Sequence, residues 1–236
     1  MSSVWSVPAA QAGESERASF LRKVGALTFG GLTASAVAAI VSTFVIASVP
    51  ALQGRFAAMA IILGAWALSN FVFGPAIANA DAIPMKLGAF FAGSMSQGVA
   101  LGYMLLTAVA VAVNDGSNPF LIVGQAMALT ALTGVGLLGW LSTGPKDLSM
   151  VKGALAIAAL PMLGLMAITF IFPVGGIMGI AISAVFVVIS TAGLLYQLDQ
   201  VMHGTPTNRW VEGAYQITLG LLVLFWNLLS LLSRRR

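Results

Sequence analysis

The side chains in this sequence that could do chemistry are neutral amides set inside long apolar stretches. They are Asn70, Gln97, Gln125, Gln197, Gln216 and Asn227. Such groups hydrogen-bond between membrane helices, which contributes about 0.6 kcal/mol each on average, or they line a water-filled path. The sequence favours interhelical hydrogen bonds. Gln197, Asn227 and Gln216, together with the nearby Asp199, are the candidates if a polar pore exists instead.

The single histidine, His203, follows Asp199 by four residues, so the two side chains would meet on one face of a continuing helix. We expect an ordinary surface pair here rather than a pH sensor. With one histidine and no cysteine, no cluster of histidine and cysteine ligands can form around a metal. No nucleophile and base can be paired in a shared cavity. We therefore predict no catalytic residue, no metal site, no cofactor and no enzymatic activity.

Charge is scarce and is kept away from the apolar stretches. Of the 236 residues, 59% are hydrophobic and 8% are charged, against roughly 25% charged in soluble domains. The composition excludes an ordinary soluble domain and predicts an integral membrane protein surrounded by lipid. No charged side chain lies in the middle of a stretch, which argues against a pump or a proton-coupled transporter. The basic residues are scattered or terminal, so we expect no nucleic-acid partner.

The apolar stretches are long enough to cross a bilayer as helices, which requires about 20 residues each. Seven stretches qualify: Val24–Val49, Phe56–Ala80, Leu87–Val113, Pro119–Leu141, Gly153–Phe172, Val174–Leu198 and Val211–Leu232. They do not alternate as barrel strands do. The sequence predicts an all-α fold with seven transmembrane helices in a single domain over residues 20–236, preceded by a flexible tail over residues 1–19.

The distribution of lysine and arginine predicts the orientation, because these residues collect on the cytoplasmic side. Residues Arg17, Arg22, Lys23, Lys86, Lys146, Lys152 and Arg209 would all face one side. Only Arg55 lies between spans on the other side, so we expect the amino terminus to be cytoplasmic. Seven crossings then put Arg234–Arg236 outside, against this rule. Either the last helix returns or the early spans determine the topology, and its length favours crossing.

Polar landmarks carry a resemblance to a known family. The segments are Ala181–Ser190, Gly193–Gln200, His203-Gly204 and Thr207-Asn208, with further agreement in Phe20–Val24, in Leu141–Thr143 with Lys146–Ser149 and Gly153, and in Asn227-Leu228 with Ser230–Leu232. Together they resemble the YccA branch of the Bax inhibitor-1 family of seven-helix membrane proteins. The resemblance covers nearly the whole chain and is strongest over residues 141–208.

The resemblance implies two activities. Many members of the family are described as calcium leak channels gated by protonation of paired aspartates on the last two helices. The corresponding positions here are Gln197 and Leu224, which cannot titrate. Asp199 is a poor substitute because two residues turn a helix by about 200°. The sequence therefore argues against gating of this type.

The branch implies instead a bacterial inner-membrane protein that acts through a partner, the AAA+ protease FtsH, as its substrate and modulator. The tail over residues 1–19 would then be the handle, the segment that the protease grips first. A set of polar side chains would face the cytoplasm and partners: Arg22, Lys23, Lys146, Asp147 and His203. A passive leak channel without the aspartates, or a structural subunit of a larger membrane complex, is the alternative.

Overall fold

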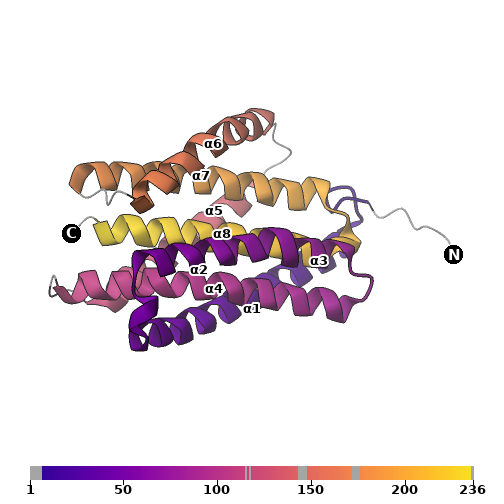
Figure 1. Ribbon diagram of the computed structural model, residues 1–236. Helices are drawn as coiled ribbons and strands as arrows, with labels where there is room; N and C mark the ends of the chain where they lie inside the picture. The colour runs from indigo at the N-terminus through magenta and orange to yellow at the C-terminus, as the bar shows by residue number, and fades with distance from the viewer. Residues whose placement is uncertain (1–6, 115, 117, 143–147, 172–175, 235–236) are drawn as a thin grey trace.

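The computed structural model describes residues 7–234 apart from 115, 117, 143–147 and 172–175 (Figure 1). Every regular element in these ranges is helical, which confirms the all-α fold. In chain order the elements are α1 (Glu14–Ser48), η1 (Pro50–Leu52), α2 (Arg55–Ala67), η2 (Leu68–Phe73), α3 (Gly74–Asn79), α4 (Ile83–Asn114), α5 (Pro119–Ser142), α6 (Ser149–Ile171), α7 (Gly176–Asp199), η3 (Gln200–Gly204), η4 (Thr207–Arg209) and α8 (Trp210–Arg234).

Six helical segments of the described chain are long and apolar enough to cross a membrane. They confirm an integral membrane protein and match six of the expected spans. The remaining expected span, Gly153–Phe172, falls on α6 (Ser149–Ile171), a 23-residue helix with Pro161 in its interior. Several of its side chains lie outside the described residues, so the count of seven crossings stays a prediction.

The second span is one continuous helical segment with a π-turn in its middle. Residues Leu68–Phe73 form the π-helix η2 between α2 and α3. Pro75 lacks an N–H and cannot bond to the carbonyl four residues earlier. The N–H of the preceding residue, Gly74, bonds to the Ser69 carbonyl, five residues back, as in a π-turn. The wider turn brings Ser69 to the inside of the bundle, where its side chain is 1% exposed.

Helix α8 lies in the middle of the bundle and contacts α1, α4, α5 and α7, while α6 lies at the edge against α7 (Figure 1). The tightest packing joins α1 to α4, which approach at Gly98 and Gly102. At Gly98 an added Cβ atom would overlap the Ser35 carbonyl oxygen, so only glycine fits. The Ser35 hydroxyl donates to the Ser94 carbonyl oxygen at 2.7 Å. Small residues thus let two membrane helices meet at their backbones.

The amino-terminal boundary differs from the expected one at residue 19. Helix α1 begins at Glu14, because a helix can continue beyond the membrane where charged residues are hydrated. Residues 7–12, which we name the clip, lie across the segment that joins α7 to α8. The Ala10 N–H donates to the Met202 carbonyl at 3.0 Å and the Thr207 N–H donates to the Val7 carbonyl at 3.2 Å. Residues 7–19 therefore contact the helical body.

Ala9 anchors the clip. Its side chain is fully buried and belongs to an apolar cluster with Phe20 of α1, Val201 of η3 and Val211 of α8. Just beyond the clip, the Thr207 hydroxyl donates to the Glu16 carboxylate at 2.5 Å. These contacts join the amino-terminal segment to the α7–α8 connection, 191 residues away in the sequence.

Candidate functional site

A polar groove lies within the membrane-spanning part of the bundle. It has a volume of about 240 Å³ and is formed by four helical segments: α2 with η2, α4, α7 and α8. The residues that line it are Trp66, Ser69, Asn70, Gln97, Ser190, Gly193, Leu194, Gln197, Leu219, Gly220 and Val223. Side chains with amide or hydroxyl groups face a space where polar groups are otherwise costly. The groove is therefore the candidate functional site.

One wall of the groove is positioned by the π-turn. The Gln97 amide of α4 donates to the Ser69 hydroxyl at 2.6 Å and to the Ala65 carbonyl at 3.1 Å. The Tyr215 hydroxyl of α8 lies 3.4 Å from the Ser69 carbonyl. Carbonyl groups near the π-turn thus gain partners from two other helices, which holds the second span in place.

The opposite wall of the groove contains a polar atom that lacks a hydrogen-bond partner among the described residues. The side-chain oxygen of Gln197 is buried and accepts no hydrogen bond within the described part of the chain. It lies against the backbone of Gly220, where a Cβ atom would overlap it. Asn70 is exposed, and its amide donates to the Trp66 carbonyl of its own helical segment at 2.8 Å. The groove therefore has hydrogen-bonding capacity that the described residues leave unused.

The four candidates for a polar pore do not come together. Gln197 lines the groove, whereas Gln216 is exposed on α8. Asn227 lies farther along α8, with its amide 3.5 Å from the Phe186 carbonyl of α7. Between Gly220 and Asn227 on α8 lies Leu224, which is 0% exposed and packs in an apolar cluster with two leucines of α7. Asn227 thus contacts the neighbouring helix α7 rather than the groove.

The remaining pore candidate, Asp199, lies at the end of α7. Its carboxylate meets the His203 Nδ1 at 2.8 Å, four residues on, as the spacing predicts. This pair lies outside the groove lining. Residues Lys146 and Asp147, expected to face partners, lie outside the described residues.

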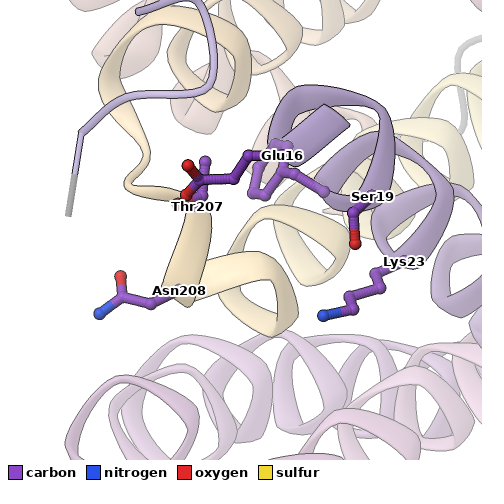
Figure 2. Close-up of a pocket in the computed structure, with 6 residues that line it drawn as sticks. Glu16, Ser19, Lys23, Thr207 and Asn208 are labelled. Carbon is purple, nitrogen blue, oxygen red and sulfur yellow. Dashed lines mark hydrogen bonds between the residues drawn. The ribbon is translucent and has the colours of Figure 1, made fainter. Parts of the chain in front are cut away.

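Arg22 and Lys23 are exposed near the start of α1. The Lys23 ammonium lies 5.9 Å from the ring centre of Trp210 at the start of α8. Beside it is a second hollow of about 220 Å³, shown in Figure 2, in which Glu16 meets Thr207 while Ser19 and Lys23 point from α1. Its polar lining on α1 is exposed to water, so this hollow has fewer unmet hydrogen bonds than the groove.

An ion pair that the sequence does not reveal joins α4 to α8. The Lys86 ammonium lies 2.6 Å from a Glu212 carboxylate oxygen, and the two side chains are 16% and 13% exposed. The other carboxylate oxygen of Glu212 is buried and has no hydrogen-bond partner among the described residues. The charge pattern placed Lys86 at the cytoplasmic surface but did not indicate its partner. Their separation of 126 residues left the pairing undetermined.

We expect Lys86→Met to lower the free energy of unfolding by about 2 kcal/mol, less than the roughly 3–5 kcal/mol of a fully buried pair, because it leaves a partly buried carboxylate without its counter-ion. Thermal unfolding in detergent measures this change. The double variant Lys86→Met/Glu212→Gln removes both charges and should regain most of the lost stability. Equal unfolding temperatures for the wild type and the single variant would show that the pair contributes nothing.

Comparison with known proteins identifies the family. Residues 17–236 match the family model described as "Inhibitor of apoptosis-promoting Bax1". An uncharacterised membrane protein of Vibrio cholerae is 29% identical over 203 residues, covering 86% of this chain and 83% of its own length. The "Modulator of FtsH protease YccA" of Escherichia coli K12 is 28% identical over 152 residues, covering 64% of this chain and 65% of its own length.

A shorter match has higher identity. An uncharacterised protein of Pseudomonas aeruginosa is 31% identical over 110 residues, which cover 47% of this chain and 49% of that protein. The chain thus spans about half the length of this curated relative. The family model, in contrast, covers all the described membrane helices except the first residues of α1. The chain therefore belongs to the Bax inhibitor-1 family of integral membrane proteins.

Proposed function

We propose that this chain acts through a protein partner in a bacterial inner membrane, as a substrate and modulator of an AAA+ protease of the FtsH type. The similarity to YccA, whose name states that role, is the observation that carries the proposal. In this proposal the chain is not an enzyme and uses no cofactor.

The distribution of charge supports a cytoplasmic amino terminus. Lys23 on α1, Lys86 on α4 and Arg209 before α8 belong to one end of the bundle, since Lys23 lies beside Trp210 and Lys86 pairs with Glu212. Arg55 begins α2 after the whole length of α1 has been crossed. Membrane proteins keep their lysines and arginines mainly on the cytoplasmic side. The proposed protease would therefore meet the chain at the end that carries the clip.

The clip limits where the protease could first hold the chain. A protease that extracts helices from a membrane must first hold an extended end of the chain. Residues 7–12 are hydrogen-bonded to the α7–α8 connection, and Glu14 already begins a helix. Engagement beyond residue 6 thus requires the clip to open. In our proposal, the stability of this contact sets how readily the chain is degraded.

The experiment is the turnover of the full-length chain by a purified FtsH-type protease in liposomes. Deleting residues 2–12 removes the handle but keeps α1 from its first residue, so we expect degradation to slow several-fold, as terminal segments are where proteolysis starts. Removing Arg235 and Arg236 from the other end is the control and should leave the rate unchanged. Unchanged turnover after the amino-terminal deletion would contradict the proposed handle.

A further inference from the structure

The groove among α2, α4, α7 and α8 reaches the exposed surface of the bundle. Trp66 of α2 and Val223 of α8 both line it, and each is 50% exposed. All the helices that form it belong to candidate membrane spans. An occupant can therefore enter sideways from the membrane and must suit a polar pocket within it.

The lining indicates a neutral, hydrogen-bonding occupant. Its polar groups are the amides Asn70, Gln97 and Gln197 and the hydroxyls Ser69 and Ser190, with no acidic or basic side chain. A charged group would have no counter-ion here, which is costly in a membrane. A carboxamide or a hydroxyl could both donate to and accept from these side chains.

Gln197 supplies the unused acceptor. Its side-chain oxygen is buried without a partner against Gly220. The last torsion of a glutamine side chain is broad, so the carboxamide can rotate and turn this oxygen into the groove. A donor from outside would then satisfy it.

The size and shape of the groove indicate a side chain carried on a helix. A volume of about 240 Å³ is below the roughly 300–1,000 Å³ of pockets that enclose small-molecule ligands. Gly193 of α7 lines the groove, and nothing lies within 4 Å of a Cβ atom added there. Small residues of this kind allow a further membrane helix to approach closely.

We propose that the groove is the docking site for a transmembrane helix of the partner protein, which inserts one carboxamide or hydroxyl side chain between α2 and α7 and bonds to Gln197. The identity of the partner as a membrane protease rests on the proposed function above. The inserted side chain completes the hydrogen bonds that the described residues leave open.

The test is photocrosslinking of the full-length chain, with a purified FtsH-type protease, in liposomes of phosphatidylethanolamine and phosphatidylglycerol. A benzophenone amino acid replaces Val223 at the mouth of the groove, or Val188 as the control. Val188 is 68% exposed on α7 and does not line the groove. We expect a crosslink to the protease from position 223 and none from position 188.

Two further variants separate docking from folding. Gln197→Leu loses the acceptor without leaving a new unpaired group, and we expect it to weaken the crosslink about three- to fifteenfold, the range for interhelical hydrogen bonds. Gly193→Phe fills the groove and should abolish the crosslink. Thermal unfolding in detergent checks that each variant remains folded, and a variant that fails this check is replaced by Gly193→Leu.

The outcomes also separate this inference from the proposed function. Equal crosslinking from positions 223 and 188, crosslinking of position 223 to lipid alone, or full crosslinking by folded Gln197→Leu and Gly193→Phe variants would each overturn the docking site. If the protease degrades the chain from its amino terminus but no crosslink forms, the proposed function stands without this site. A specific crosslink, combined with a degradation rate that does not change when residues 2–12 are deleted, supports docking and contradicts engagement at the amino terminus.

Discussion

Gly98→Ala is expected to lower the free energy of unfolding by about 2 kcal/mol, because overpacking a close contact costs roughly 1–3 kcal/mol. The added methyl group would overlap the Ser35 carbonyl oxygen and come within 2.8 Å of the Ala38 Cβ atom. Both belong to α1, and a backbone carbonyl cannot move aside as a flexible side chain can. The two helices must separate, which also disturbs the hydrogen bond from Ser35 to the Ser94 carbonyl.

The matched control lies on the same helix. Nothing lies within 4 Å of a Cβ atom added at Gly88 of α4. Alanine is a better helix former than glycine by about 0.8–1.0 kcal/mol, so Gly88→Ala should keep or raise stability. Thermal unfolding in detergent should place Gly98→Ala about 4–8 °C below the wild type, given about 2–4 °C per kcal/mol for a protein of this size. Equal unfolding temperatures for the two variants would refute a rigid contact between α1 and α4.

The helices could be predicted from the sequence because apolarity is a local property. The expected span from Pro119 begins at the first residue of α5, and the expected end at Val113 lies one residue before the end of α4. The ends that differ are those where a helix leaves the membrane. Helix α1 continues back to Glu14, since hydrated charged residues do not break a helix. Uncharged stretches in the sequence therefore mark the part of a helix that crosses the membrane and leave out its hydrated ends.

The groove could be predicted only in part. The sequence singles out Gln197, because an amide in an apolar stretch needs a hydrogen-bond partner. Its relation to Ser69 and Gln97 depends on how three helices are rotated about their axes, which a single sequence does not state. Pro75 was the available signal for the π-turn, since a proline inside a span removes a backbone hydrogen bond. The π-turn itself depends on the neighbouring helices, since Gln97 and Tyr215 supply hydrogen-bond partners to Ser69.

The pore candidates lie at different levels of the bundle for a related reason. Gln197 and Asn227 lie on neighbouring helices, and their residue types suggested one shared path. The antiparallel packing of α7 on α8 instead pairs Asn227 with the Phe186 carbonyl and brings Gln197 to Gly220. Fully buried Leu224 lies between these two levels on α8. The register of two packed helices decides whether polar residues meet, and composition alone does not contain it.

Ala9→Asp is expected to speed degradation of the chain by an FtsH-type protease about tenfold or more, since each 1.4 kcal/mol of lost local stability is a factor of ten. Ala9 is fully buried among Phe20, Val201 and Val211. A carboxylate placed there would have no counter-ion and would favour the open clip. Proteolysis follows the population of the open form when opening is fast relative to cleavage.

The control adds the same charge to the same segment. Gln11 is exposed two residues away, so Gln11→Asp should leave the clip closed and the degradation rate unchanged. Hydrogen exchange gives a readout that does not involve the protease. The Ala10 N–H, which donates to the Met202 carbonyl, should exchange faster in Ala9→Asp than in Gln11→Asp.

The two measurements test separate steps, the opening of the clip and its engagement by the protease. Faster exchange at Ala10 without faster degradation would mean that the clip opens but does not limit the protease. Unchanged exchange would mean that Ala9 does not hold the clip. The deletion of residues 2–12 and the Ala9→Asp variant alter the same segment with opposite expected effects, because one removes the handle and the other releases it. A general loss of stability would speed degradation in both variants, so opposite signs can arise only if this segment is the point of engagement.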